Sequence, residues 1–205
     1  MKKYFYSFIL VLCFVVIGNN KDESKAGNVM LTPASMGFSF TEALTISNIW
    51  VSSGRKYVSS YIAEGEDFYI DRDVKIKEIP SAYQGMLWVE TANDDKMSVS
   101  PSEYLRYEIN QDATVYVGYD TRLSVPGWLS GWSNTEDVIK SDDQEGKNSY
   151  RLYRKDFAGG SVTLGPNAAS QSSSNMYIVL NAPQGDHFVD WTPPEPPTGL
   201  RVLRY

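Results

Sequence analysis

Short runs of alternating apolar and polar residues recur along the chain from Ile46 onward, separated by turn residues about every 8–15 positions. In the run Tyr104–Ile109, Leu105 and Tyr107 fall on one face of an extended chain and the polar residues on the other. A period of two predicts half-buried β-strands. The predicted strands are Ile46–Val51, Lys56–Ser60, Phe68–Ile70, Lys75–Glu78, Met86–Glu90, Tyr104–Ile109, Thr114–Tyr119, Tyr150–Lys155, Ser161–Leu164 and Met176–Leu180, with a further first strand expected at Met36–Phe40.

No segment keeps a 3.6-residue period over three turns, so few helices are expected. Many short strands with turns between them predict an all-β fold, an antiparallel β-sandwich or jelly roll. The short connection Asn110–Ala113 predicts that the strands on either side of it form a hairpin. The acidic stretch Asn134–Asn148 is expected to be a solvated loop, and Ser170–Asn175 a serine-rich turn.

The N-terminus has the pattern of an export signal. Lys2 and Lys3 precede the apolar stretch Tyr4–Ile17, and the chain becomes polar after Gly18. This order predicts a secretory signal peptide over residues 1–18, with an uncleaved anchor as the alternative. The apolar stretch is short for a membrane span, which needs about 20 residues. Export predicts a protein that is secreted or held at the cell surface.

Changes in composition predict the boundaries of the segments in the rest of the chain. Residues 19–41 are predicted to be a flexible lead-in, and residues 42–191 to form the β-sandwich. Residues 192–198 contain four prolines in seven positions, which predicts an extended linker. Residues 199–205 have the pattern of one more strand.

The net charge and the small numbers of cysteine and histidine exclude several classes of binding partner and metal site. The formal net charge of −6 disfavours electrostatic binding to nucleic acid, and also to a membrane surface after signal cleavage. A single cysteine excludes an internal disulfide and a multi-cysteine zinc site, and a single histidine excludes sites that need two imidazoles. The aromatic content of 13% favours β-structure.

No catalytic residue can be named from the sequence. It has no Gly-x-Ser-x-Gly elbow, no Walker-type loop and no GxGxxG motif. His187 lies next to an acid, but no serine or cysteine nucleophile is recognisably paired with it, so a surface or turn histidine is the simpler interpretation. Pairs of carboxylates for glycoside hydrolysis are set in space and cannot be recognised from spacing.

Calcium is the one cofactor that the sequence allows for. Asp71, Asp73 and Asp94 lie in acidic turns, and hard oxygen ligands of this kind suit Ca²⁺. The spacing is not that of an EF-hand loop. Such turns also form simply because Asp and Asn side chains bind nearby backbone amides, and this second interpretation is the more common one.

The stretch Tyr119–Trp132 gathers the residues best suited to bind a ligand. Trp128 and Trp132 follow Asp120 and Arg122 closely, just after a predicted strand. Sugar rings pack their C–H faces on aromatic rings, while Asp and Arg side chains bind hydroxyl groups. These four residues are the predicted glycan-binding site. The alternative is that one or both tryptophans seal the end of the core.

Several short motifs, taken together, carry a resemblance to a known class of module. They are Tyr69–Asp73, Thr91–Lys96, Tyr104-Leu105, Val115–Arg122, Pro126–Leu129 and Ser161–Gly165. In this order, over roughly residues 46–181, the chain resembles accessory β-sandwich modules found beside catalytic domains in secreted bacterial polysaccharide-degrading proteins. Separately, Pro196–Val202 resembles the opening strand of a fibronectin type III domain, so residues 199–205 are expected to begin a truncated domain of that type.

The resemblance implies a non-catalytic ancillary module that binds a polysaccharide or surface glycan and has neighbouring domains in a longer protein. A structural or adhesive surface spacer is the alternative from a different class. A polysaccharide lyase or hydrolase fragment that works without histidine is the third possibility.

Overall fold

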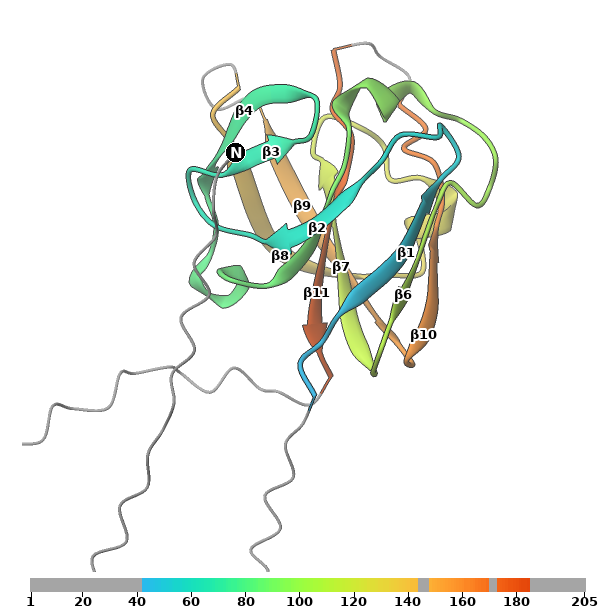
Figure 1. The fold of residues 1–205 in the computed structure, drawn as a ribbon. Helices are drawn as coiled ribbons and strands as arrows, with labels where there is room; N and C mark the ends of the chain where they lie inside the picture. Colours follow the sequence, from blue (N-terminus) through green and yellow to red (C-terminus); the bar gives the residue numbers. More distant parts are fainter. Residues whose placement is uncertain (1–41, 144–147, 170–172, 185–205) are drawn as a thin grey trace, which may run out of the picture. The chain divides into compact units, whose positions relative to one another are not determined.

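Eleven strands and three short 3₁₀ turns make up the part of the chain that this computed structural model describes, residues 42–143, 148–169 and 173–184 (Figure 1). All strand pairings are antiparallel. The strands are β1 (Ile46–Val51), β2 (Val58–Tyr61), β3 (Asp67–Tyr69), β4 (Arg72–Glu78), β5 (Leu87–Glu90), β6 (Leu105–Ile109), β7 (Ala113–Asp120), β8 (Ser133–Ser141), β9 (Ser149–Phe157), β10 (Gly160–Leu164) and β11 (Ile178–Pro183). The turns are η1 (Ser81–Tyr83), η2 (Asn93–Met97) and η3 (Gly127–Leu129).

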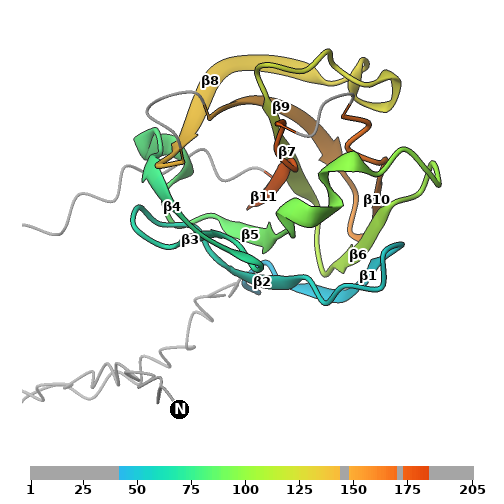
Figure 2. The ribbon, with the colours of Figure 1, turned by 90° about the horizontal axis from the view of Figure 1, so that it is seen from above.

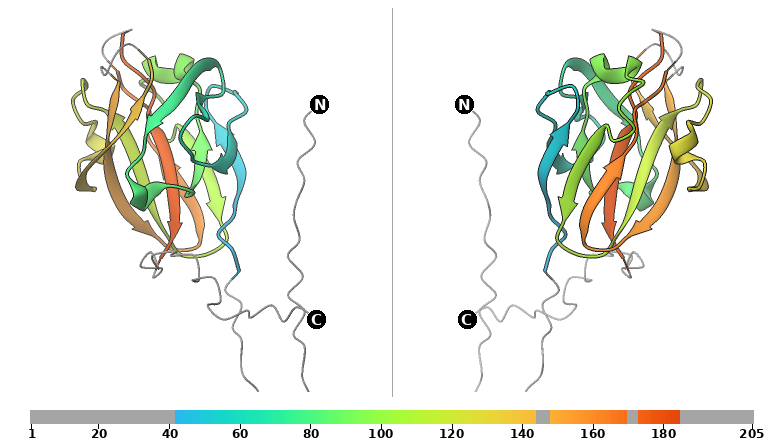
Figure 3. Two further views of the ribbon diagram at one scale, coloured as in Figure 1. Left: turned by 90° about the vertical axis from the view of Figure 1, so that its left-hand side faces the viewer. Right: turned by 90° about the vertical axis from the view of Figure 1, so that its right-hand side faces the viewer.

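The strands form two sheets that face each other as a β-sandwich. The smaller sheet has the order β1-β6-β10, and the larger has the order β2-β5-β11-β7-β9-β8-β4-β3. The view from above shows that the larger sheet is strongly curved (Figure 2), and the side views show the two layers (Figure 3). The Ile70 N–H donates to Thr91 O at 3.0 Å, which ties the turn after β3 to the segment after β5.

The core lies between the sheets and follows from the alternation in the sequence. On β6, Leu105, Tyr107 and Ile109 are buried and the intervening Arg106 and Glu108 are exposed. Strand β7 lies between β11 and β9 in the larger sheet and is buried along nearly all its length. On one of its faces, Tyr116 packs edge-on against Tyr83 of η1. A Cβ on Gly118 would lie 2.7 Å from Ile178 Cγ1, so the close approach of β7 and β11 requires glycine there.

The predicted all-β antiparallel sandwich is confirmed, and each of the ten strands predicted from Ile46 onward is found with small shifts at its ends. The predicted acidic loop Asn134–Asn148 is wrong, because most of it is strand β8. A register shift between Asn134 and Val138, with Glu136 at a φ of 66°, interrupts the alternation that would have marked a strand. Neighbouring elements compensate its charges: Glu136 pairs with Arg151, and Asp137 accepts from the Tyr83 hydroxyl.

The predicted hairpin around Asn110–Ala113 is also wrong. Strand β6 belongs to the smaller sheet and β7 to the larger one, so the connection crosses between the layers. Two packed sheets are about 10 Å apart, a gap that four residues span as easily as they close a hairpin. Polar side chains fix the crossing: Asn110 Oδ1 accepts from Thr45 N, and Asp112 Oδ1 accepts from Gly159 N.

Other predictions fall on residues outside those described. These are the signal peptide, the lead-in with its strand Met36–Phe40, the turn residues 170–172, His187, the Pro-rich linker and the fibronectin-like strand. Within the described residues, no helix has the length and apolar character that crossing a membrane requires.

Candidate functional site

Five segments from separate parts of the sequence meet at one end of the sandwich, the upper end in Figure 1, and enclose a polar pocket of about 530 Å³. We call this the loop end. The segments are the turn between β3 and β4, η2, the residues after β7, the residues between β8 and β9, and the residues before β11. The lining residues are Asp71, Arg72, Asp73, Val74, Asn93, Lys96, Arg122, Asp143, Asn148, Ser173 and Asn175.

Of the predicted site residues Asp120 and Arg122, Arg122 lines the pocket, and Asp120 is buried behind it and holds it. The Asp120 side chain is fully buried and accepts hydrogen bonds from the Arg122 Nε at 2.9 Å, its Nη2 at 2.5 Å and its backbone N–H at 3.0 Å. It also accepts from Asn175 N at 3.0 Å. The hydrogen bond to Asp120 is the main reason that the pKa of Arg122 is raised. Asp120 therefore holds Arg122 in place, while the guanidinium, with its side chain about one-third exposed, lines the pocket.

Buried amide side chains complete the floor. Asn93 Oδ1 accepts from Met176 N at 2.9 Å, and Asn167 Nδ2 donates to Lys96 O at 2.8 Å. Asn175 satisfies its neighbours best with its amide oxygen accepting from the Tyr150 hydroxyl and from Arg122 Nη2, each at 3.0 Å. Buried polar groups are costly unless they are paired, so this network specifies one arrangement of the loops.

Tyrosine hydroxyls support the loop end from below. Tyr69 donates to Met176 O at 2.7 Å and lies 2.9 Å from the Tyr150 hydroxyl, and Tyr119 donates to Asn167 O. Burial raises the pKa of Tyr119 to about 12, with the Asp120 charge as a second cause. Burial also raises the pKa of Tyr69 well above its usual value. These hydroxyls are therefore neutral donors at physiological pH.

The acidic turns predicted as metal ligands are engaged by other partners. Asp71 accepts from the backbone N–H groups of Asn93 and Asp94, both at 2.9 Å, and so caps the first turn of η2 from a distant segment. Asp94 pairs with Arg72 at 2.5 Å and with Arg55 at 3.2 Å. Asp73 is largely exposed and lies 3.4 Å from the Lys75 ammonium.

Within the described residues, no three acidic, histidine or cysteine side chains come together in a way that could hold a metal ion. Calcium bound to Asp71, Asp73 or Asp94 stays a prediction, which a melting experiment can test.

Trp128 and Trp132, the other predicted site residues, are both half-buried and pack against the core. Their rings lie 6.2 Å apart at an interplanar angle of 85°, so they do not share one flat surface. Trp128 Nε1 donates to Pro166 O at 2.8 Å, and its ring stands edge-on to Tyr177. A Cβ on Gly165 would lie 2.3 Å from Trp128 Cδ1, which shows that the indole lies directly on this glycine.

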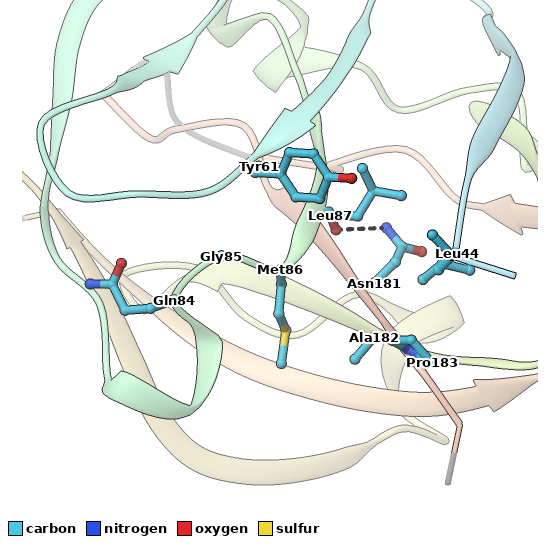
Figure 4. Close-up of a pocket in the computed structure, with 10 residues that line it drawn as sticks. Leu44, Tyr61, Gln84, Gly85, Met86, Leu87, Asn181, Ala182 and Pro183 are labelled. Carbon is cyan, nitrogen blue, oxygen red and sulfur yellow. Dashed lines mark hydrogen bonds between the residues drawn. The ribbon is translucent and has the colours of Figure 1, made fainter. Parts of the chain in front are cut away.

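A second hollow of about 480 Å³ lies at the opposite ends of β5 and β11, and we call it the edge groove (Figure 4). Its lining is mainly apolar and comprises Ala43, Leu44, Tyr61, Gln84, Gly85, Met86, Leu87, Asn181, Ala182 and Pro183. Tyr61 is 66% exposed at its mouth. Asn181 is buried beneath it, accepts from the Tyr107 hydroxyl at 2.8 Å and donates to Leu87 O.

The sequence identified part of the loop end. It marked Asp71, Asp73, Asp120 and Arg122 as candidate site residues, and it marked Asn93 and Lys96 only as members of the motif Thr91–Lys96. It did not single out Asn148 or Asn175 as ligand-binding residues, and these reach the pocket only because distant loops converge. Asn and Asp are common in ordinary turns, so a sequence does not distinguish such residues from those that line a binding site.

Comparisons with known proteins show what fold this is. No family model matches the chain, and no curated protein matches it. Among solved structures it is similar to a β-glucuronidase from glycoside hydrolase family 2, with a TM-score of 0.60 and 17% identity over 66% of this chain. A glycoside hydrolase family 138 enzyme that targets pectin rhamnogalacturonan II matches with a TM-score of 0.45 and 14% identity over 66% of this chain. The chain spans 14% and 16% of the lengths of these two proteins, so the likeness to the first is that of one β-rich domain fold.

Proposed function

We propose that this chain is a non-catalytic carbohydrate-binding module of an exported, polysaccharide-active protein, and that the pocket at the loop end is its glycan site. The observation that carries the proposal is the set of planar polar groups held rigidly around one pocket by a buried network. The export pattern over residues 1–18, and the occurrence of a similar domain fold within a glycoside hydrolase, support the setting.

The lining chemistry suits sugar hydroxyl groups. A hydroxyl donates one hydrogen bond and accepts two, and Asp, Asn and Arg side chains supply acceptors and donors in fixed planes. In the described part of the chain, the Lys96 ammonium has no ion-pair or hydrogen-bond partner, although it lines the pocket. Both Lys96 and the fixed Arg122 guanidinium therefore supply donors for a ligand.

The pocket size fits a small part of a glycan. Ligand sites are usually 300–1,000 Å³, and this one is about 530 Å³. Rigid donors lower the entropy lost on binding, so a polar ligand gains more from this floor than from mobile surface side chains. Asp120 acts through Arg122, as a positioning residue. Trp128 and Trp132 do not line the pocket, and they remain proposed glycan contacts outside it, where a longer chain could reach their half-buried rings.

The test is a polysaccharide array with the 205-residue chain, followed by titration of the strongest ligand. Lys96→Ala should weaken binding about 10- to 150-fold, since a hydrogen bond from a charged group contributes about 1.5–3 kcal/mol. Lys77→Ala is the matched control, because Lys77 is an exposed lysine on β4 outside the pocket. Trp132→Ala in the same series tests the proposed aromatic contact.

Three results would overturn the proposal. Absence of binding to any polysaccharide would favour the spacer function. Equal affinities of the Lys96→Ala and Lys77→Ala variants would remove the pocket as the site. Release of new reducing ends or unsaturated products from a bound polysaccharide would show a hydrolase or lyase.

A further inference from the structure

The outer face of the β1-β6-β10 sheet displays a tryptophan that the core does not use. Trp50 is 46% exposed, whereas Trp88 is 1% exposed and Trp128 and Trp132 are half-buried against the core. Tryptophan is usually mostly buried, and an exposed one is a common feature of recognition surfaces. We call this surface the Trp50 face.

A β-bulge places Trp50 on this side of the sheet. Ser47 pairs with Glu108 and Trp50 with Arg106, so three steps along β1 match two steps along β6. Without the extra residue, the regular alternation that starts at Ser47 would turn Trp50 inward and Ile49 outward. Asn48, within the bulge, has a φ of 51°, a conformation that non-glycine residues rarely adopt. The backbone thus accepts an unfavourable conformation that results in an exposed indole.

Neighbouring side chains hold the indole and surround it with polar groups. The Arg106 guanidinium carbon lies 5.5 Å from the centre of the Trp50 ring. Asn48 Nδ2 donates to Glu108 Oε2 at 2.6 Å. Ser161 and Thr163 of β10 pair with Glu108 and Arg106 on the far side and are also exposed. The face therefore offers one fixed aromatic ring with hydroxyl, amide and charged groups in rows beside it.

We propose that the Trp50 face is a second glycan-binding surface, separate from the loop-end pocket, which takes an uncharged polysaccharide lying flat on the sheet. A sugar ring is apolar on its C–H faces and polar around its rim, which matches one aromatic ring among polar side chains. Arg106 and Glu108 cancel each other in charge, so the face gives no net attraction to a polyanion.

A protein partner fits this surface less well. Stable protein interfaces bury about 800 Å² on each partner, with a core of several apolar or aromatic residues. On the Trp50 face, Trp50 is the one large apolar side chain among the outward residues of the three strands, the others being Ser47, Asn48, Arg106, Glu108, Ser161 and Thr163. Even with Val58 of β2, which is 45% exposed and lines the same hollow as Trp50, this surface has too little apolar area for a stable protein interface.

The test is affinity electrophoresis of the 205-residue chain in gels containing xylan, mannan or hydroxyethylcellulose, with polygalacturonate as the anionic comparator. The variants are Trp50→Ala, Trp50→Phe and, as a control with similar exposure in the loop between β7 and η3, Val125→Ala. We expect Trp50→Ala to lose about tenfold or more in affinity for a neutral polysaccharide, by analogy with bases stacked on aromatic side chains. Trp50→Phe should retain part of this affinity, and Val125→Ala all of it.

The melting temperature of each variant distinguishes a loss of affinity from a loss of stability. Removal of an exposed side chain should leave the melting temperature nearly unchanged. Unchanged retardation of Trp50→Ala in every gel would overturn the proposal. Equal losses of affinity in Trp50→Ala and Val125→Ala, or a preference for polygalacturonate, would also overturn it. The loop-end site is judged independently, because Lys96→Ala should leave the Trp50-dependent retardation intact.

Discussion

The loop-end pocket and the edge groove lie at opposite ends of the same two strands, β5 and β11, and have similar volumes of about 530 and 480 Å³. Their linings differ in kind. The pocket has Val74 as its one apolar side chain, whereas the groove is built largely from Leu44, Met86, Leu87 and Pro183. Volume alone therefore does not tell the two apart as functional sites.

The difference lies in what each end requires of the fold. Beneath the pocket, buried polar groups such as Asp120, Asn93 and Asn175 must each be matched by a partner, or the fold loses stability. The groove needs less matching, because apolar contacts are non-directional and Asn181, paired with Tyr107 and Leu87, is the buried polar side chain in its lining. Fully paired polar networks make a protein rigid, and this rigidity suits the selective binding that we propose for the loop end.

The largest expected effect is alkaline unfolding, which should come mainly from the loop end. Beneath the edge groove, burial raises the pKa of one tyrosine, Tyr107, which donates to Asn181. At the loop end, five tyrosine hydroxyls of the described residues make hydrogen bonds: Tyr57, Tyr69, Tyr119, Tyr150 and Tyr177. Burial raises the pKa of each of these five in the folded state, for Tyr119 to about 12. Their stabilising contribution is present below the unfolded pKa of about 10 and is lost as the pH rises above it.

Each such tyrosine should lower the free energy of unfolding by about 1.4 kcal/mol per pH unit above about pH 10. Urea unfolding at about pH 8, 9, 10 and 11 measures the loss. Tyr69→Phe should reduce the slope with pH, whereas Tyr61→Phe in the edge groove should not change it. Identical slopes for these two variants would contradict the assignment of the effect to the loop end.

The second effect concerns the buried carboxylate. Asp120→Ala leaves Arg122 and the Asn175 N–H without their acceptor, and should lower the free energy of unfolding by about 3–5 kcal/mol. Asp73→Ala is the matched control because its side chain is 92% exposed, and it should change stability by less than about 0.5 kcal/mol. Chemical denaturation of both variants measures the difference. A loss below about 1 kcal/mol for Asp120→Ala would show that the floor does not depend on this carboxylate.

A smaller effect tests how firmly Trp128 is fixed beside the loop end. Gly165→Ala would bring a Cβ to within 2.3 Å of the Trp128 ring and must displace it. We expect a loss of about 1–3 kcal/mol, as for other overpacked sites. Gly131→Ala is the control, since its Cβ would meet nothing within 4 Å. Equal melting temperatures of the two variants would mean that the Trp128 ring moves freely.

Calcium should have the smallest effect. If Ca²⁺ binds Asp71, Asp73 or Asp94, it competes with the N–H groups and the arginines that already hold Asp71 and Asp94. We therefore expect millimolar Ca²⁺ to raise the melting temperature above that in chelator by no more than about 3 °C, which corresponds to about 1 kcal/mol. No shift would remove the metal site, and a larger one would mean that the loop end rearranges around the ion.

Much of the fold could be predicted because period-two alternation survives in most strands. The prediction of secondary structure failed at β8, because the bulge near Glu136 interrupts the alternation. The prediction of topology failed after Ile109, because a four-residue connection can either close a hairpin or cross between the sheets. The site was predictable only where a residue type is distinctive by itself, as with Asp120 and Arg122. Asn148, Asn175 and Lys96 depend on loop convergence, and the outward Trp50 depends on strand register, so neither is visible in local sequence.

The central claim is that the loop end binds a glycan. Hydrogen–deuterium exchange of the 205-residue chain, with and without the polysaccharide selected by the array, tests it most directly. The account predicts slower exchange of backbone amides at residues 71–73, 93–97 and 173–176, with no change at residues 84–87 of the edge groove. Protection confined to residues 84–87 and 181–183 would contradict it.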